Sequence, residues 1–218
     1  MNQKIWLVRH GETEWAALGR HTGRTDIPLT ASGKLQGRAL APRLAAHLFA
    51  LVLSSPLQRA AETCRLAGYG EKVEFSDMLL EWDYGLYEGR TTLEIRREKP
   101  AWTIWRGDPP GGETLSQVAR RADKIIARLT SVDGDCLLFA HAHMLRVIAA
   151  RWLTLPPGAA RFLALSPASL SVLGYEHESR VIINWNDLCH LTSVPGALTA
   201  AEPEPPVTDA GYPADHQS

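Results

Sequence analysis

The sequence predicts an α/β fold of three layers, with helices on both faces of a largely parallel central sheet. Two observations carry this prediction. Short apolar runs typical of buried strands alternate along the chain with longer segments of helical character. The chain has 218 residues, of which 45% are hydrophobic, so it is long enough to bury a sizeable core within one domain.

The first half of the chain is expected to contain two main helices. Its predicted elements are a strand over 4–8, a loop over 9–30, a helix over about 31–48, a strand over 50–54, a helix from Pro56 and a weak strand over 73–75. Thr30 and Ser55 are suitable N-caps for the two helices, and Pro56 suits a first helical position. The apolar side of the first helix is expected to carry Leu35, Leu40, Leu44 and Leu48.

The second half of the chain is expected to complete the sheet. Its predicted elements are an irregular region over 78–112 with a short helix near 92–98, a helix over about 113–130, a strand over 135–140, a helix over 143–153 and a hairpin of strands over 169–176 and 181–185. From about 195 the chain is rich in Pro, Ala and Glu. We therefore predict one domain over 1–194 and a disordered tail over 195–218.

Charge and cysteine content narrow the class of protein. The formal net charge is -1, which gives no general attraction to nucleic acid or to an anionic membrane. The longest apolar stretch, over 137–153, is interrupted by His and Arg, and the apolar run at the N-terminus is too short for a signal peptide. Three cysteines with no CxxC pair predict a reducing compartment, so we expect a cytoplasmic protein.

Polar side chains that can bind ligands or take part in catalysis follow the predicted strands. Arg9 and His10 end the first strand, Arg59 lies one turn into the helix after the second, and His141 closes the strand over 135–140. Glu81 lies in the irregular region, within the stretch LLEWDYGLYEG. Because ligands of open α/β sheets bind at the carboxyl ends of the strands, we expect these five side chains to converge there.

This set of residue types suits phosphoryl transfer. Arginine binds phosphate oxygens with a planar, permanently charged fork, and a neutral histidine attacks phosphorus through one ring nitrogen while the other is held. A carboxyl group kept protonated by burial can protonate the leaving oxygen and then deprotonate water. The helix that begins near Pro56 is expected to direct backbone N–H groups at the anion. The guanidinium charges make a metal or other cofactor unnecessary.

Several motifs resemble those of the histidine phosphatase (phosphoglycerate mutase-like) superfamily, in the order typical of that family. They are LVRHGETEW, TGRTDIPLT, SSPLQRAAET, LLEWDYGLYEG, GGETLSQVARRA and FAHAHMLRVIAARWL, and they span roughly residues 4–153 and beyond. A lone RHG is a weak signal, whereas the ordered set is specific. The stretches EWDYGLYEG, WTIWRGD and AHAHMLR are most similar to sedoheptulose-1,7-bisphosphatase-like enzymes, which hydrolyse sugar phosphates.

The resemblance implies a role for each matched position. His10 would be the nucleophile that becomes phosphohistidine, and Glu81 the proton donor and then the base. The residues implied to bind the transferred phosphoryl group are Arg9, Arg59 and His141. The residues implied to contact the rest of the substrate are Thr22, Gly23, Tyr84, His143 and Arg146, the last through a second, distal phosphate. At Ala142 the family has glycine, which raises the question whether the backbone there needs a positive φ.

Structural interpretations compete with these roles. His141 and His143 in HAH could instead be a metal pair, but no nearby Asp or His completes a ligand set. Glu88 and Asp83 are interpreted as surface charge. For Trp102 and Trp105 a packing role is favoured over stacking on the substrate. The sequence does not decide between these two roles. The remaining histidines are interpreted as structural or surface residues: His21, His47, His177, His190 and His216.

Three functions follow from these residues. The first is a metal-independent phosphatase that hydrolyses small phosphorylated metabolites, such as sugar phosphates or bisphosphates, through phosphohistidine. The second is a cofactor-dependent mutase of the phosphoglycerate type, which keeps the phosphoryl group and excludes water. The third is a non-catalytic module that binds phosphorylated ligands. The short stretch between 89 and 112 offers little material for a closing lid, which favours hydrolysis. A monomer and a homo-oligomer are both compatible with the sequence.

Overall fold

The computed structural model, which describes residues 3–192, 194, 195 and 197, contains one mixed sheet of six strands in the order β3-β2-β4-β1-β5-β6. The strands are β1 (Ile5–Arg9), β2 (Leu51–Ser54), β3 (Glu74–Phe75), β4 (Cys136–Ala140), β5 (Leu170–Glu176) and β6 (Ser179–Asp187). Strands β1 to β4 pair in parallel, whereas β5 runs antiparallel to both β1 and β6. The predicted largely parallel α/β sheet is therefore confirmed.

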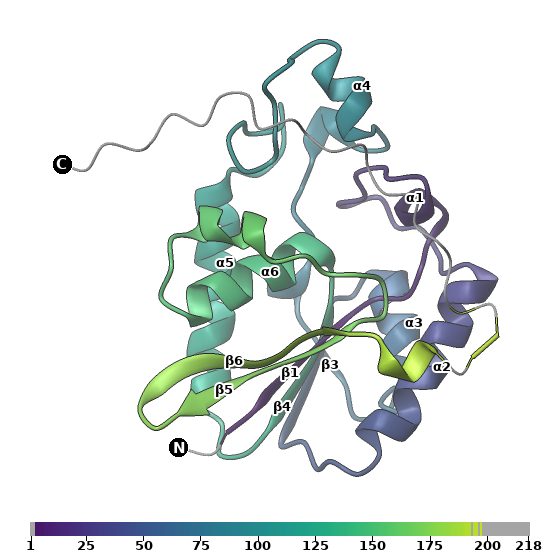
Figure 1. Cartoon of the computed structure of the whole chain (residues 1–218), viewed down its shortest axis with the longest axis vertical. Helices are drawn as coiled ribbons and strands as arrows, with labels where there is room; N and C mark the ends of the chain where they lie inside the picture. The colour runs from purple at the N-terminus through teal and green to yellow at the C-terminus, as the bar shows by residue number, and fades with distance from the viewer. Residues whose placement is uncertain (1–2, 193, 196, 198–218) are drawn as a thin grey trace.

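Helices cover both faces of this sheet, as Figure 1 shows. The α-helices are α1 (Glu14–Ala17), α2 (Ala31–Leu44), α3 (Gln58–Leu66), α4 (Thr92–Arg96), α5 (Leu115–Thr130) and α6 (Ala142–Trp152). Short 3-10 helices are η1 (Asp77–Leu79), η2 (Gly85–Tyr87), η3 (Pro157–Phe162) and η4 (Cys189–Leu191). Helices α2 and α3 pack together on one face and α5 and α6 on the other, which gives the three predicted layers.

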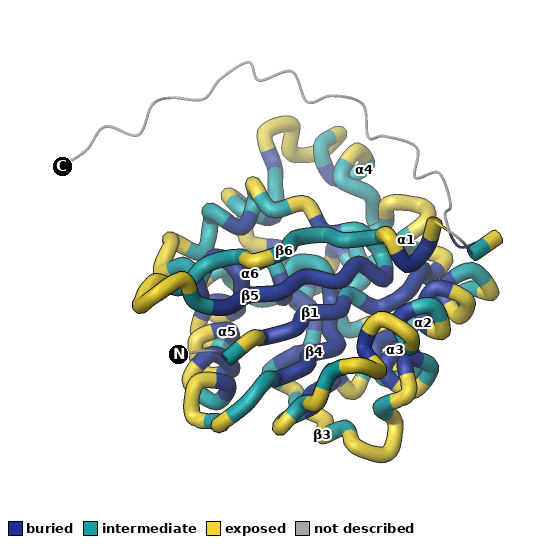
Figure 2. The backbone as a smooth tube through the Cα atoms, turned by 60° about the horizontal axis from the view of Figure 1, so that its bottom comes forward, coloured by how far each residue is buried: buried dark blue, intermediate teal, exposed yellow. Residues whose placement is uncertain are grey.

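The side chains of each central strand enter two separate cores in alternation, because successive side chains of a strand point to opposite faces of the sheet. In β1, Ile5 and Leu7 join the core under α5 and α6, whereas Trp6 and Val8 join the core under α2 and α3. The central strands β1 and β4 lie deep in the molecule, as the dark blue of Figure 2 shows. Burial on both faces explains why these strands appear in the sequence as continuous apolar runs.

The helix after the first loop is shorter than predicted. It ends at Leu44 instead of about 48, so Leu48 is 95% exposed, and Leu35 also faces solvent. Leu40 and Leu44 carry the buried side as predicted. The loop over 9–30 contains the short helix α1, which the sequence did not suggest. Thr13 caps it by accepting a hydrogen bond from the backbone N–H of Ala16.

The second helix, α3, begins at Gln58 and not at Pro56, and its N-cap position is Leu57. The predicted Ser55 cap is wrong, because no side chain caps α3 at Leu57. The Ser55 hydroxyl accepts a hydrogen bond from the Leu57 backbone N–H at 3.4 Å and lies 2.8 Å from His141 Nε2. At the chain's other end, Ala197 is fully buried and its carbonyl accepts a hydrogen bond from the Gln36 amide. Packing thus reaches beyond the predicted boundary at 194, while the remainder of the predicted tail lies outside the described residues.

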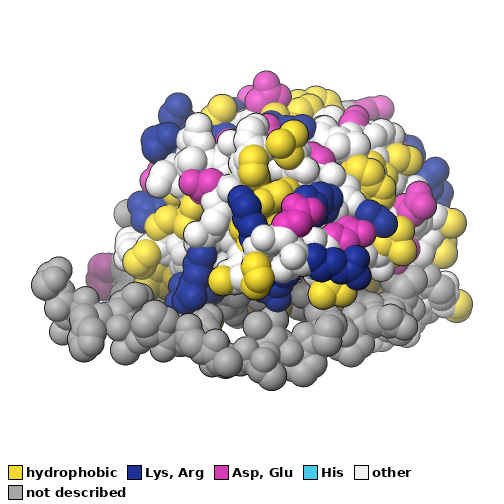
Figure 3. All heavy atoms as spheres, turned by 90° about the horizontal axis from the view of Figure 1, so that it is seen from above, with side chains coloured by type: hydrophobic (Ala, Val, Ile, Leu, Met, Phe, Trp, Pro, Cys, Tyr) yellow, Lys and Arg dark blue, Asp and Glu magenta, His cyan; other side chains and the backbone are white. Residues whose placement is uncertain are grey.

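None of the helices within the described residues is long and apolar enough to cross a membrane. On the face shown in Figure 3, basic side chains stand among acidic and apolar ones and form no single field. The three cysteines are free thiols. The cytoplasmic location expected from the sequence stays a prediction.

Candidate active site

The carboxyl ends of β1 and β4 bring two histidines together. The strands are in parallel register, with Arg9 opposite Ala140, so the next residues, His10 and His141, leave the sheet side by side. Their ring centroids are 5.2 Å apart. The backbone N–H of His10 donates to the Ala140 carbonyl at 3.0 Å, which fixes where the strand ends.

His10 has the protonation state that a nucleophile needs. Its Nδ1 lies 2.7 Å from the carbonyl oxygen of Gly11. Because a carbonyl only accepts, Nδ1 carries the proton in this contact and Nε2 keeps its lone pair. Burial first, and then the charges of Arg59 and Arg9, hold the pKa of His10 well below its usual value. The imidazole is therefore neutral near pH 7.

Arg59 and His141 lie behind His10, fully buried. Arg59 Nε donates to His141 Nδ1 at 3.1 Å, so His141 directs an Nε2–H at the Ser55 hydroxyl. The rest of the guanidinium binds the carbonyl oxygens of Thr22, Gly23 and Thr25 at 2.8 to 3.2 Å. Neither Arg59 nor His141 borders the cavity described below, so phosphate binding by them stays a prediction.

The loop over 22–25 is held from its other side by Glu88. The Glu88 carboxylate accepts hydrogen bonds from the backbone N–H groups of Gly23, Arg24 and Thr25. The interpretation of Glu88 as surface charge is therefore wrong: it fixes the loop that carries two predicted substrate residues. A Cβ at Gly23 would collide with the Glu88 carboxylate and the Trp82 carbonyl, so this close approach requires glycine.

Glu81 lies at the N-terminus of α6 and caps that helix from outside. Its carboxylate accepts hydrogen bonds from the backbone N–H groups of Trp82 and Met144 at 2.9 Å and of His143 at 3.0 Å. Burial raises the pKa of Glu81, but His143, His141 and the Trp82 N–H outweigh it and hold the pKa below its usual value. The expectation that burial keeps Glu81 protonated is wrong for the ligand-free protein.

The N-terminus of α3 is occupied by a protein carboxylate. The Gln58 N–H donates to Asp26 Oδ1 at 2.8 Å, and the Gln58 side chain donates to the Asp26 carbonyl at 2.7 Å. This helix end therefore binds Asp26 instead of the substrate anion that the sequence suggested. The helix N-terminus at the predicted site is that of α6, which holds Glu81.

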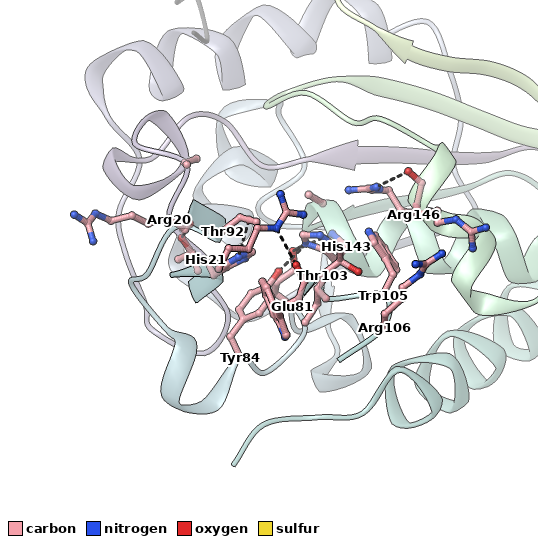
Figure 4. A pocket seen from close by; sticks show the side chains of 18 of the residues that line it. Arg20, His21, Glu81, Tyr84, Thr92, Thr103, Trp105, Arg106, His143 and Arg146 are labelled. Atoms are coloured by element: carbon pink, nitrogen blue, oxygen red, sulfur yellow. Dashed lines mark hydrogen bonds and ion pairs between the residues drawn. The ribbon is translucent and has the colours of Figure 1, made fainter. Parts of the chain in front are cut away.

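A cavity of about 880 Å³ opens over these strand ends (Figure 4). We call Arg9, His10 and Glu81 the pocket floor, because they come from the strand ends and the stretch beside them. We call a second set of lining residues, contributed by loops and helices further along the chain, the pocket wall. It consists of Trp105, Arg106, Arg146, Arg161 and Phe162.

Arg9 contributes to the pocket floor a hydrogen-bond donor, Nε, that has no partner among the described residues. Its Nη1 donates to the Leu165 carbonyl at 2.5 Å, whereas its buried Nε has no hydrogen-bond partner among the described residues. Burial lowers the pKa of Arg9 to about 10, so the guanidinium keeps its charge near pH 7. A buried, charged and incompletely paired guanidinium beside a neutral imidazole is suited to an anion.

The pocket wall concentrates positive charge against aromatic rings. Arg146 lies over the Trp105 ring at 4.7 Å and donates to the carbonyls of Ala160 and Arg161. Arg161 lies over the Phe162 ring at 4.2 Å. Neither guanidinium forms an ion pair with an acidic side chain of the described residues. The wall therefore keeps a net positive charge next to the floor.

Three further side chains connect the floor to the wall. The Tyr84 oxygen lies 2.6 Å from His143 Nδ1, and the same nitrogen lies 3.8 Å from Glu81 Oε2. Trp105 packs against the His143 ring at a centroid distance of 5.1 Å. His21, interpreted from sequence as structural or surface, lies over the Tyr84 ring at 4.8 Å and lines the cavity.

The predicted substrate residues thus divide into two groups. Thr22, Tyr84, His143 and Arg146 border the cavity, whereas Gly23 lies behind it. Sequence reasoning missed further lining residues, which include Arg20, His21, Thr92, Arg96, Thr103, Arg106, Arg161 and Phe162. For His21 a signal existed, because it immediately precedes the Thr22 motif. Thr103 and Arg106 lie in the stretch WTIWRGD, and the others come from stretches with no motif of their own.

Two questions raised by the sequence are answered by local geometry. Ala142 is the first residue of α6 and is not among the residues with positive φ, so this position does not require glycine. Across the described residues, no group of three or more His, Cys, Asp or Glu side chains is placed to hold a metal ion. His141 and His143 are held instead by Arg59 and Tyr84.

Comparison with known proteins defines the class of this molecule. The family model described as "Histidine phosphatase superfamily (branch 1)" matches residues 5–188. An acid phosphatase of Mycobacterium tuberculosis is 40% identical over 184 residues, which cover 82% of this chain and 90% of that protein. The sedoheptulose 1,7-bisphosphatase of Saccharomyces cerevisiae is 34% identical over 183 residues, which cover 67% of this chain and 66% of that protein.

A solved structure gives the same result for the fold. The structure of an open reading frame of Mycobacterium tuberculosis superposes with a TM-score of 0.82 at 36% identity, over 85% of this chain and 98% of that one. The chain belongs to the histidine phosphatase superfamily. The family resemblance and the enzyme class inferred from the motifs are therefore confirmed.

Proposed function

We propose that the protein hydrolyses phosphate monoesters of small metabolites through a phosphohistidine on His10. The observation that carries this proposal is the contact between His10 Nδ1 and the Gly11 carbonyl, which leaves a neutral ring with a lone pair on Nε2 at the cavity floor. The relatives named acid phosphatase and sedoheptulose 1,7-bisphosphatase support hydrolysis as the reaction.

In the first half-reaction, His10 Nε2 attacks phosphorus and the bond to the leaving oxygen breaks. Arg9 compensates the charge of the phosphoryl oxygens, and Arg59 and His141 are proposed to do so from behind. The leaving oxygen takes a proton from Glu81. In the second half-reaction a water attacks phosphorus, gives its proton to Glu81 and releases His10. The guanidinium groups supply the charge, so the proposed route needs no metal.

The proposed substrate class is a sugar phosphate or bisphosphate with a second anionic group. The cavity of about 880 Å³ is far larger than one phosphate, and its wall places Arg146 and Arg161 beyond the floor. Both guanidinium groups are free of acidic partners among the described residues, so a second phosphate or a carboxylate there would gain charge-assisted hydrogen bonds. Thr22, Tyr84 and His143 are proposed to contact the intervening carbons and hydroxyls.

The test is phosphate release with a chelator present. Sedoheptulose-1,7-bisphosphate is expected to give free phosphate, and denaturation during turnover is expected to trap an acid-labile phosphoprotein. His10→Ala is expected to lose both signals, and His47→Ala, a histidine outside the cavity, to keep both. Unchanged phosphate release from His10→Ala contradicts the proposal. Conversion of 3-phosphoglycerate to its isomer without free phosphate would identify a mutase instead.

A further inference from the structure

The proposed reaction leaves one proton unaccounted for. The leaving oxygen must receive a proton when its bond to phosphorus breaks, and Glu81 is the side chain placed to give it. Yet three backbone N–H groups hold the Glu81 carboxylate in its ionised form. Glu81 must therefore acquire a proton after the free protein has formed this capped arrangement and before the bond breaks.

His143 is the side chain beside Glu81 that is built to deliver that proton. Its Nδ1 lies 3.8 Å from Glu81 Oε2 and 2.6 Å from the Tyr84 oxygen. Burial, followed by the negative charges of Glu81 and Glu88, raises the pKa of Tyr84 well above its usual value, so the phenol keeps its proton and donates it to Nδ1 at rest. When Nδ1 itself becomes protonated, the Tyr84 oxygen can accept, because a hydroxyl does both.

Two other histidines of this region, His10 and His141, are less suited. His10 Nδ1 is bound to the Gly11 carbonyl, and its Nε2 has to attack phosphorus. His141 is enclosed by Arg59 at Nδ1 and by Ser55 at Nε2. His143 borders the cavity, so its ring has access to water and to the bound substrate.

We propose that His143, held by Tyr84, is the positioning residue that loads Glu81 with a proton when an anionic substrate binds. This inference rests on the proposed phosphatase reaction. The proton enters from solvent to His143 Nδ1, passes to Glu81 Oε2 and then to the leaving oxygen. The water that attacks the phosphohistidine returns a proton to Glu81, and departure of the phosphate restores the ionised carboxylate and releases the proton to solvent.

The charges around the His143 ring explain why loading follows substrate binding. Burial opposes protonation of the ring most strongly, and the charges of Arg146 and Arg9 oppose it as well. Glu81 favours it, and the nearby His21 and Tyr84 are neutral. A phosphate dianion bound at Arg9 offsets the opposing charges and adds a negative charge near His143 and Glu81. Protonation of this pair thus becomes favourable only in the complex.

The first experiment measures protons directly. Tungstate, a tetrahedral dianion that does not titrate at pH 7.5, is bound to the protein in two buffers of different ionisation enthalpy in a calorimeter. We expect the wild type to take up about one proton per site. His143→Gln is expected to bind tungstate with most of that uptake lost. His177→Asn, which removes an exposed histidine, is the matched control and is expected to keep it.

The second experiment measures whether His143 contributes to protonation of the leaving group during catalysis. His143→Gln and the conservative Tyr84→Phe are assayed on glycerol phosphate, whose alkoxide leaving group needs a proton, and on p-nitrophenyl phosphate, whose leaving group does not. We expect kcat to fall about 10-fold or more for glycerol phosphate in His143→Gln, with a smaller loss and a shifted pH profile in Tyr84→Phe. The loss with p-nitrophenyl phosphate is expected to be clearly smaller than the loss with glycerol phosphate in both variants, because its leaving group needs no proton.

These outcomes separate the inference from the function on which it rests. Equal proton uptake in the wild type and in His143→Gln overturns the inference, and so does an absence of uptake in the wild type, since the proton would then arrive on the substrate. Equal losses on both substrates in His143→Gln also overturn it, because they indicate a structural role. Failure of the proposed function is different: no phosphohistidine would be trapped in the wild type.

Discussion

The floor and the wall of the cavity are built in contrasting ways. The floor comes from strand ends in fixed register, and His10, Glu81 and their neighbours use most of their donors and acceptors within the protein. The wall comes from segments without strands, and the guanidinium groups of Arg146 and Arg161 are held by ring faces and backbone carbonyls. A rigid floor in which Arg9 Nε has no partner among the described residues suits one chemical step on an anion, while a cationic wall suits recognition of the remainder of the substrate.

The largest expected effect separates chemistry from binding at the floor. Glu81→Gln keeps an acceptor at the α6 N-terminus but removes the transferable proton. We expect kcat for glycerol phosphate to fall about 10²–10⁴-fold, with KM little changed and a much smaller loss for p-nitrophenyl phosphate. Steady-state kinetics on the two substrates measure this difference. Asp83→Asn, a carboxylate of the same stretch that does not border the cavity, is the control. Equal losses on both substrates would argue that Glu81 only holds α6.

The next effect tests whether the wall recognises a second anion. Arg146→Gln is expected to lower kcat/KM for a sugar bisphosphate about 10–100-fold, because one charge-assisted contact is lost. The loss for p-nitrophenyl phosphate, which has no second anion, is expected to stay within about twofold. Arg151→Gln is the matched control, since Arg151 lies on the same helix but pairs with Asp123 outside the cavity.

Two results would break the contrast between floor and wall. An equal loss on both substrates in Arg146→Gln would mean that Arg146 supports the floor, for instance through its place over Trp105. An unchanged kcat/KM for the bisphosphate would mean that Arg146 does not bind the second anion. Arg161→Gln would then be the variant to measure.

The floor was predictable from sequence, whereas of the wall only Arg146 was predicted, through the family resemblance. Arg9, His10 and His141 immediately follow apolar runs, and the ends of parallel strands meet at one edge of a sheet. Trp105 and Arg161 are 56 residues apart (161 − 105) in stretches without periodic pattern, and only the folded chain brings them to one cavity. The sequence also did not predict that the Glu81 carboxylate is ionised. Its hydrogen bonds come from the start of α6, a helix that begins 61 residues later (142 − 81).

The start of α3 was predicted wrongly for the same reason, because contacts with distant parts of the chain determine it. The composition around Ser55 and Pro56 is typical of a capped helix, yet Ser55 lies against His141 and the N–H of Gln58 is satisfied by Asp26. Local sequence ranks possible caps, but a partner from a distant loop replaces them when it fits better. Residues such as Glu88, which fix a loop through its backbone, carry no local signal for that role either.

A smaller effect concerns stability at acid pH. Burial, followed by the neighbouring His143 side chain, lowers the pKa of His21 to about 4 in the folded protein, from 6.5 when exposed. Between these values the unfolded chain binds more protons, so stability falls as pH falls through that window. Denaturation by urea at pH 7 and pH 5 is expected to show this loss, and His21→Phe to reduce it by about 1–2 kcal/mol. An unchanged loss in His21→Phe would assign the acid sensitivity to other buried histidines, such as His10 and His141.

The smallest expected effect concerns Ala142, a position where the chain departs from the family motif. Ala142 starts α6 with an ordinary backbone conformation and lines the cavity beside His143. Ala142→Gly therefore relieves no strain and is expected to cost about 0.5–1 kcal/mol of unfolding free energy, because glycine loses more chain entropy in a helix. Activity on both kinds of substrate is expected to stay within about twofold, as measured beside Ala149→Gly on the same helix. A severalfold gain restricted to bulky substrates would show that this Cβ narrows the passage between floor and wall, and would make position 142 part of substrate selection.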